Sequence, residues 1–284
     1  MNKKVLVGVL GPNGSYSEEA ALKLFSGCDL RVDYLTTQSV IEDVSRLNLD
    51  YGVVPVENSI QGIVSATLDS LLTSRVGILG EIILPIHHVL ASLPSAKRFN
   101  RVISHEQALS QCSEFLRTEY PKCVLEPVAS TSYAANKVSS ESLLDSLVVC
   151  SEFAAKTYGL KVVSSNLSSF NETRFLIVGN ELTMPTGFDK SMIAFGLIDK
   201  PGALYDSLKV FKDYDINLSR IESRPTKKKL GDYLFYVDFT GHVLDELVIK
   251  ALNELKALTS FVKVLGSYPK NLNKSFNLGD INGL

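Results

Sequence analysis

The sequence predicts an α/β protein that ends in a smaller domain of ferredoxin-like βαββαβ order. The chain has 284 residues, which is long for one hydrophobic core and favours two domains. Up to about residue 180, apolar strand-like runs alternate with amphipathic helical runs, as in a sheet that is covered by helices. After a linker signal at Met184-Pro-Thr-Gly187, the order changes to strand, helix, two strands, helix and strand.

The elements of the first domain follow from its hydrophobic pattern. Runs rich in valine, isoleucine and leucine predict strands at 5–10, 31–35, 51–59, 76–93 (as two strands), 101–104, 123–128, 147–150, 162–165 and 173–178. Amphipathic runs predict helices at about 18–25, 38–47, 64–72, from 105 onward, 133–138 and 152–158. Ser15 or Ser17 is the expected N-cap of the first helix, Ser130 or Thr131 is that of the helix at 133–138, and Gly159 ends the last.

The second domain is predicted to have four strands and two helices. The strands are expected at 192–198, 216–224, 233–240 and 261–268, and the helices at 202–214 and 245–258. The basic run Lys227-Lys-Lys229 before Gly231 is expected to be a solvated hairpin turn, and the polar tail from Lys270 to be loosely held.

Composition and charge exclude several classes of function. Hydrophobic residues make up 45% of the chain and charged residues 21%, and the formal net charge is −2. This balance gives no electrostatic reason to expect nucleic acid or an anionic membrane as a partner. No apolar run approaches the length of a membrane span, and the N-terminal run is too short for a signal peptide. Four scattered cysteines without CxxC spacing favour a reduced, cytoplasmic protein.

The common signatures of metal and nucleophile chemistry do not occur in the sequence. It contains no HExxH, no GxSxG and no Cys/His pair at metal-ligand spacing. His87 and His88 are adjacent on an expected strand, so their side chains point to opposite faces and are interpreted as core or linker residues. The loop Gly11–Ser17 differs from both nucleotide-binding glycine patterns. No metal and no cofactor are predicted.

Polar side chains lie repeatedly where an apolar strand gives way to a turn or a helix. In Ser169-Phe-Asn-Glu-Thr-Arg-Phe175, interpreted as a polar turn before a strand, Asn171 and Thr173 offer neutral hydrogen bonds and Arg174 a permanent charge. This set suits a small anionic molecule that is rich in oxygen. Helix capping explains part of the pattern, for example at Glu57-Asn-Ser59. The residues by themselves leave the reaction open.

Several motifs resemble, in order, those of prephenate dehydratases. They are Gly11-Pro-Asn-Gly-Ser-Tyr-Ser17, Val54-Pro-Val-Glu-Asn-Ser-Ile-Gln-Gly62, Ser104-His-Glu-Gln-Ala-Leu-Ser-Gln-Cys112, Ser130-Thr131 with Ala134-Ala135, and Asn171-Glu-Thr-Arg-Phe175. The second domain resembles an ACT regulatory domain through Gly202-Ala-Leu204, Ile216-Asn-Leu218 and Ile221-Glu-Ser-Arg-Pro225. The resemblance covers roughly residues 5 to 268. It departs at Ser15, where the family often has threonine, and at Val148-Val-Cys-Ser151, where smaller residues are usual.

The resemblance implies a two-lobed, periplasmic-binding-protein-like catalytic domain at 1–183 and an ACT domain at 188–270, with a polar tail at 271–284. Lobe A would span about 1–80 and 160–183, and lobe B about 81–159. The implied activity is the decarboxylating dehydration of prephenate to phenylpyruvate in phenylalanine biosynthesis. The alternatives are an arogenate dehydratase and a catalytically silent amino-acid sensor.

The resemblance also implies roles for individual residues. The expected catalytic residues are Thr173, Arg174, Asn58, Ser59, Glu57 and Thr131. The expected substrate-binding residues are Asn171, Phe175, Ser104, His105, Gln107, Ser15 and Tyr16. Thr173 is expected to donate a hydrogen bond to the departing oxygen and Arg174 to clamp a carboxylate, while a purely capping role stays open for His105.

Feedback by L-phenylalanine is the implied regulation. In related ACT domains the amino acid binds between two domains of a dimer, so a homodimer or a dimer of dimers is expected. The residues assigned to this site are Gly202, Ala203, Leu204, Asn217, Leu218, Glu222 and Ser223. Alternatively, some of these residues are only turn, core or interface residues, and this alternative applies most to Leu204 and Leu218.

Overall fold

The computed structural model describes residues 5–25, 27–165, 167, 170–226 and 233–270. The expected basic turn at Lys227–Lys229 and the tail from residue 271 lie outside the described residues. The chain forms two compact units: unit 1 is Met1–Val40, Val53–Ser65 and Ile83–Phe175, and unit 2 is Ile41–Gly52, Ala66–Ile82 and Leu176–Leu284. Within the described part of the chain, every helix is too short or too polar to cross a membrane.

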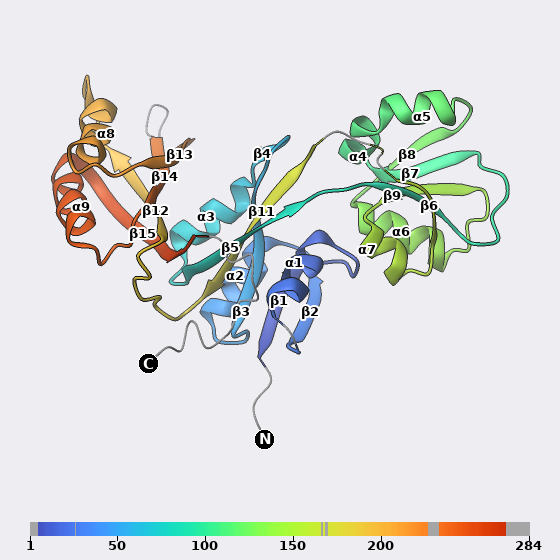
Figure 1. Ribbon diagram of the computed structural model, residues 1–284, viewed down its shortest axis with the longest axis horizontal. Coiled ribbons are helices and arrows are strands. Elements are labelled where there is room, and N and C mark those ends of the chain that lie inside the picture. The colour runs from blue at the N-terminus through green and yellow to red at the C-terminus, as the bar shows by residue number, and fades with distance from the viewer. Residues whose placement is uncertain (1–4, 26, 166, 168–169, 227–232, 271–284) are drawn as a thin grey trace. The chain divides into compact units, whose positions relative to one another are not determined.

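Strands and helices alternate through the first two thirds of the chain (Figure 1). The elements are β1 (Leu6–Leu10), α1 (Tyr16–Leu24), β2 (Asp29–Tyr34), α2 (Thr37–Ser45), β3 (Tyr51–Asn58), β4 (Gly62–Ile63), α3 (Ser65–Thr73), β5 (Gly77–Pro85), β6 (Val89–Ser92), β7 (Arg101–His105), α4 (Glu106–Gln111), α5 (Ser113–Glu119), β8 (Val124–Val128), α6 (Thr131–Ser140), β9 (Ser146–Cys150), α7 (Glu152–Thr157), β10 (Lys161–Ser164) and β11 (Glu172–Gly179). The rest are β12 (Asp189–Leu197), α8 (Ala203–Asp213), β13 (Leu218–Pro225), β14 (Tyr233–Thr240), α9 (Glu246–Leu258) and β15 (Thr259–Pro269).

Unit 1 contains two sheets. In one, the strand order is β11-β3-β1-β2, with β1 and β2 parallel. The other has five strands in the order β10-β6-β9-β7-β8, in which β7 runs parallel to both β8 and β9. Helices α4 and α5 cover one face of this five-stranded sheet, and α6 and α7 cover the other (Figure 1). This layering places the first turns of α4 and α6 at the ends of β7 and β8.

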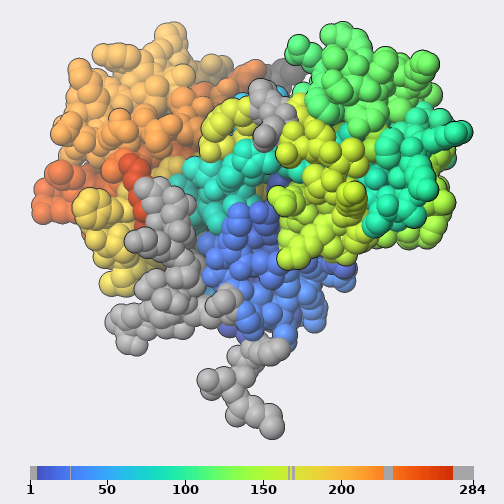
Figure 2. All heavy atoms as spheres, turned by 45° about the vertical axis from the view of Figure 1, so that its right-hand side comes forward, coloured from blue at the N-terminus to red at the C-terminus, as the bar shows by residue number. Residues whose placement is uncertain are grey.

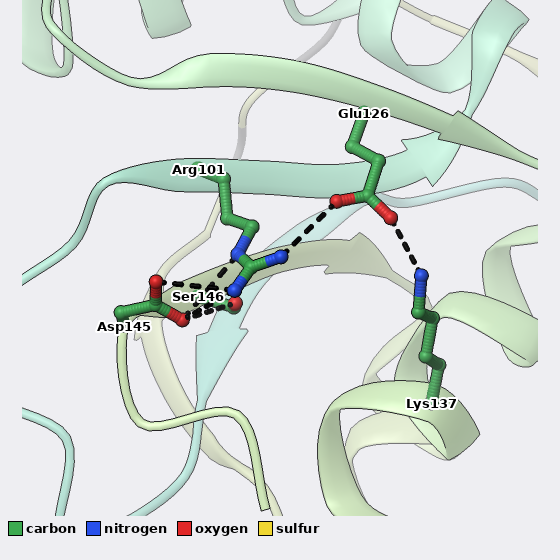
Figure 3. Close-up of polar contacts among 5 residues, drawn as sticks. All are labelled: Arg101, Glu126, Lys137, Asp145 and Ser146. Carbon is green, nitrogen blue, oxygen red and sulfur yellow. Dashed lines mark hydrogen bonds and ion pairs between the residues drawn. The ribbon is translucent and has the colours of Figure 1, made fainter. Parts of the chain in front are cut away.

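An ion-pair network holds the edge of the five-stranded sheet to α6 (Figure 3). Arg101 on β7 lies 3.1 Å from Asp145 and 3.5 Å from Glu126 of β8. Glu126 in turn accepts from the Lys137 ammonium of α6 at 2.6 Å, which lowers the pKa of its carboxyl. Because β7, β8 and α6 share these charges, the network links α6 to the sheet.

Unit 2 contains the strands β13-β14-β12-β15, which pair antiparallel, together with most of β5 and the second half of β11. Helices α8 and α9 cover one face of these four strands over an aromatic core (Figure 1). Phe195 stacks on Phe235 with ring centroids 5.6 Å apart, and Phe211 contacts Phe239. On β15, the Lys263 ammonium donates to three carbonyls at the end of α3, at 2.6–2.8 Å.

The fold class is confirmed, including the βαββαβ order of β12 to β15. Ser15 caps α1, Ser130 caps α6, and Gly159 follows α7 with φ +67°, all as expected. Three local details differ. The helix after His105 breaks at Cys112 (φ −97°, ψ 5°) into α4 and α5, the short strand β4 was not expected, and β11 begins at Glu172. Thr173 and Arg174 are strand residues, in agreement with the strand expected at 173–178, and the interpretation of residues 172–175 as part of a polar turn is wrong.

Candidate active site

A cavity of about 300 Å³ lies in unit 1. Its described wall comes from the loop after β1 (Leu10, Gly11, Ser15, Tyr16, Ser17), the end of β3 (Pro55, Asn58, Gln61), the segment between β5 and β6 (Ile86, His88), the start of α4 (His105, Gln107, Ala108, Gln111), the β8–α6 turn (Ala129, Ser130, Thr131, Ser132) and β11 (Asn171, Thr173, Phe175). No lysine, arginine, aspartate or glutamate occurs among these residues. In the ranges that the structure covers, no group of three or more His, Cys, Asp or Glu side chains could hold a metal ion.

Asn58 has a fixed amide orientation. Its Oδ1 accepts the backbone N–H groups of Ile60 and Gln61, at 3.0 and 2.9 Å. A carboxamide oxygen accepts and its nitrogen donates, so these two bonds place Nδ2 on the other side. From there Nδ2 donates to Thr173 Oγ1 at 2.8 Å and to Asn171 Oδ1 at 2.7 Å.

The Thr173 hydroxyl is consequently oriented as a donor. Because Oγ1 accepts an N–H from Asn58, its own proton points away from that amide. Thr173 is only 9% exposed, and it lies on the cavity wall. The hydroxyl proton is therefore available to an oxygen atom of a molecule in the cavity.

Asn171 and Ser59 fasten the start of β11 to the end of β3. The Ser59 hydroxyl accepts from Glu172 N at 2.9 Å and donates to Asn171 Oδ1 at 3.3 Å, and Ser59 N donates to Glu172 O. Asn171 Nδ2 donates to Gln111 Oε1 at 3.3 Å. Ser59 itself is exposed and lies off the described wall, so its contacts hold Asn171 in place.

Arg174 does not lie on the described wall of the cavity. Successive side chains of a strand point to opposite faces, so Thr173 and Phe175 face the cavity and Arg174 faces away. The Arg174 side chain is 7% exposed and lies 3.6 Å from Glu57, which is also off the described wall. The Arg174 guanidinium pairs with Glu57, and the expected role of Arg174 as a carboxylate clamp stays a prediction.

Residues of the five-stranded sheet supply another part of the wall. His105 is the N-cap of α4, where Nδ1 accepts from Gln107 N at 3.4 Å, and both residues also line the cavity. Thr131 opens α6 at the cavity, beside the N-cap Ser130. Ser104 is fully buried and donates to Val149 O at 2.6 Å, so it supports β7 and does not reach the described wall.

The loop after β1 brings Ser15 and Tyr16 to the cavity. Ser15 Oγ donates to Leu10 O at 2.8 Å and accepts from Glu18 N at 3.2 Å. The loop is held against α7, since the Tyr158 hydroxyl donates to Asn13 O at 2.7 Å. Figure 2 shows the N-terminal atoms (blue) in contact with those around residue 155 (yellow-green).

Gln111 and His88 are among the wall residues that were not predicted as site residues. Gln111 lies one turn beyond Gln107 on the same helix face, and this spacing could have predicted that Gln111 lines the cavity as Gln107 does. His88 was interpreted as a core or linker residue; it is 5% exposed and also lines the cavity. Burial lowers the pKa of His88 to about 4, so its imidazole is neutral near pH 7.

The residues assigned to L-phenylalanine lie in different places within unit 2. Gly202 (φ +82°), Ala203 and Leu204 line a cavity of about 260 Å³ at the start of α8. Asn217 and Leu218 line a separate hollow at the start of β13. Farther along β13, Glu222 is half-buried and Ser223 exposed, and neither lines these two cavities. One chain therefore does not bring the whole expected set together.

Comparison with known proteins decides the family. The model of the family described as "Prephenate dehydratase" matches residues 7–183, which is more than half of the chain. This chain belongs to the prephenate dehydratase family. Residues 191–257 match the model described as "ACT domain". The resemblance drawn from the motifs is confirmed.

Relatives in this family resemble the chain over almost its whole length. The chain is 44% identical to a bifunctional chorismate mutase/prephenate dehydratase of Aquifex aeolicus, over 96% of this chain and 75% of that protein. It is 39% identical to a prephenate dehydratase of Methanocaldococcus jannaschii, over 95% of this chain and 99% of that protein. A solved prephenate dehydratase of Arthrobacter aurescens in complex with L-Phe has a TM-score of 0.85 at 30% identity, covering 98% and 95% of the two chains.

Proposed function

We propose that this chain converts prephenate to phenylpyruvate, with the Asn58-oriented hydroxyl of Thr173 as the hydrogen-bond donor to the departing oxygen. Prephenate carries a ring carboxylate, a pyruvyl carboxylate and a ring hydroxyl. The bond from the ring to its carboxylate breaks, and the electron pair moves into the ring. The C–O bond then breaks, and oxygen leaves as hydroxide that takes up a proton. Carbon dioxide, water and aromatic phenylpyruvate result.

A donor is needed where negative charge develops, on the leaving oxygen. An alcohol is too weak an acid to transfer its proton freely near neutral pH, so Thr173 stabilises the oxygen by hydrogen bonding. The bond from Asn58 Nδ2 polarises the Thr173 hydroxyl and fixes its direction before the substrate arrives. This preorganised pair is the observation that supports the mechanism.

The reaction also requires that the ring carboxylate leave as carbon dioxide, and a cavity wall without charged side chains suits this step. A cation beside that carboxylate would stabilise the substrate more than the transition state and slow the reaction. No lysine or arginine lies on the described wall, and Arg174 is turned away to Glu57. The pyruvyl carboxylate still finds neutral donors, among them the N-terminal turn of α6 at Thr131.

Arogenate has an ammonium group in place of the keto oxygen of prephenate. The described wall holds no carboxylate that could pair with this ammonium. We therefore expect kcat/KM for prephenate to exceed that for arogenate by about 10-fold or more, the value of one modest ion pair. Rates of phenylpyruvate and phenylalanine formation with the purified chain test this. Equal or faster turnover of arogenate would reverse the substrate assignment, and no product from either would leave the silent amino-acid sensor.

We propose that the ACT domain binds L-phenylalanine and that binding lowers dehydratase activity. The cavity at the start of α8 supports this, because Gly202 lets the backbone approach a ligand and α8 has 11 residues whose first turn suits a carboxylate. The site would be completed by a second copy of the chain, whose Asn217 and β13 supply the other expected residues. A homodimer or dimer of dimers in the cytoplasm is part of this proposal.

Added L-phenylalanine is expected to inhibit prephenate turnover, with D-phenylalanine as the stereochemical control. Linkage requires that prephenate weaken L-phenylalanine binding by the same factor as L-phenylalanine weakens prephenate binding. Enzyme assays and titration calorimetry measure the two effects. Turnover that ignores L-phenylalanine, together with no heat of binding, would reject the sensor role and leave the catalytic proposal intact.

A further inference from the structure

Helix α6 begins at the cavity and presents hydrogen-bond donors there. The N-cap Ser130 accepts from Tyr133 N, and Ala134 N begins the intrahelical bonds by donating to Ser130 O at 3.0 Å. The backbone N–H groups of Thr131 and Ser132 come before these bonds and have no acceptor within the helix. Both residues lie on the described wall of the cavity. Two N–H groups at the start of α6 are thus available to a molecule in the cavity.

The Ser132 side chain adds a further donor at the same place. Ser132 is only 3% exposed, and it lies on the described wall. A buried hydroxyl normally has a hydrogen-bond partner. Among the residues that the structure covers, the Ser132 hydroxyl has none. Because an unpaired buried hydroxyl costs free energy, this group is suited to donate to an oxygen atom of a ligand in the cavity.

The charges around the start of α6 favour an anion. The helix has 10 residues, so its aligned peptide dipoles place partial positive charge at the N-terminus. The first turn of α6, which the structure describes in full, holds no aspartate or glutamate. Helix α1 also begins at the cavity, but its first turn carries Glu18 and Glu19, which balance the dipole and repel an anion. Of these two helix starts, that of α6 is the one suited to a carboxylate.

We propose that the Ser132 hydroxyl and the N–H groups of Thr131 and Ser132 bind the pyruvyl carboxylate of prephenate, which makes Ser132 a further substrate-binding residue. This inference rests on the proposed prephenate dehydratase activity. The pyruvyl carboxylate is kept through the reaction, so donors that hold it stabilise the substrate and the transition state alike. The same donors on the ring carboxylate would stabilise the group that is lost as carbon dioxide and would slow the reaction.

The test is Ser132→Ala, with kcat and KM measured on prephenate and the inhibition constant Ki measured for phenylpyruvate as a competitive inhibitor. Phenylpyruvate keeps the pyruvyl carboxylate and lacks the ring carboxylate. KM and Ki are both expected to rise by about 10- to 100-fold, the range for losing one hydrogen bond to a charged group, while kcat stays within about threefold. Ser140→Ala is the matched control; Ser140 is the exposed last residue of α6 and lies off the described wall, so parental constants are expected.

A parental KM for the folded Ser132→Ala variant would overturn the inference. A raised KM with an unchanged Ki would also overturn it, since the hydroxyl would then serve the ring carboxylate. Ser132→Asp provides a second route: aspartate is favourable in the first turn of a helix, so α6 should form, but the new carboxylate would repel that of prephenate. KM is expected to rise by about 100-fold or more, and a parental KM for this folded variant would contradict the inference. An inactive parental enzyme would instead reject the proposed function.

Discussion

Replacing Thr173 by valine is expected to lower kcat on prephenate by about 100- to 1,000-fold, equivalent to about 3–4 kcal/mol of barrier, as for loss of one preorganised donor. Valine keeps the shape of threonine and the β-branched preference for a strand. Asn58 Nδ2 would keep Asn171 Oδ1 and Glu172 O as acceptors, at 2.7 and 3.2 Å. The fold should therefore survive, and the rate of phenylpyruvate formation, followed by ultraviolet absorbance, reports the loss of the hydroxyl.

Thr157→Val is the matched control for this variant. Thr157 ends α7, and its hydroxyl donates to Phe153 O at 2.8 Å on the exposed side of the helix. Turnover by Thr157→Val should remain within about twofold of the parental enzyme, since a surface substitution of this kind changes stability by only about 0.5 kcal/mol. Near-parental turnover by a folded Thr173→Val variant would remove Thr173 from the mechanism.

Asn58→Asp is expected to lower kcat/KM by about 1,000-fold, combining the lost donor with repulsion of an anionic substrate. Aspartate keeps the acceptor for the N–H groups of Ile60 and Gln61, so the turn at residues 58–61 should persist. The oxygen that replaces Nδ2 would attract the Thr173 proton away from the cavity. It would also introduce a carboxylate into a described wall that has none.

A cycle with Thr173→Val separates the two effects of Asn58→Asp. If Asn58 acts by orienting the Thr173 hydroxyl, the double variant should lose far less than the product of the two single losses. Asn100→Asp, an exposed substitution elsewhere in unit 1, controls for the added charge. Strictly multiplicative losses would show that Asn58 and Thr173 act independently and would contradict the orientation argument.

The sequence predicted much of the fold because the hydrophobic periods and the capping residues agree with each other. The strand runs at 101–104 and 147–150 and the caps Ser15 and Ser130 are local signals, and each is found where it was expected. Asn58, Thr131 and Thr173 come from three motifs that lie far apart in the sequence, and the structure places all three on the wall of one cavity.

Other features depended on details that a linear pattern does not contain. The direction of Arg174 follows from the start of β11 at Glu172, three residues after the start of the stretch 169–175 that was interpreted as a turn. His88 reaches the cavity because the segment after β5 turns one of two adjacent histidines inward. The amide orientation of Asn58 is set by two backbone N–H groups of the following turn. The residue types in that turn do not predict the directions of these N–H groups.

In the second domain, too, the sequence did not predict which residues share a cavity. Gly202 and Leu218 come from two motifs that resemble one regulatory site, yet they line separate cavities of a single chain. The proposed regulatory site takes residues from two copies, so neither the sequence nor the fold of one chain can assemble it.

The rates of phenylpyruvate formation by Thr173→Ser and Thr173→Val, measured side by side on prephenate, test the central claim most directly. Serine keeps a hydroxyl that can accept from Asn58 Nδ2 and donate to the departing oxygen, whereas valine keeps only the shape. We predict that Thr173→Ser stays within about 10-fold of the parental kcat and that Thr173→Val falls at least about 10-fold below Thr173→Ser. Equal rates for the two folded variants would contradict a hydroxyl donor at residue 173.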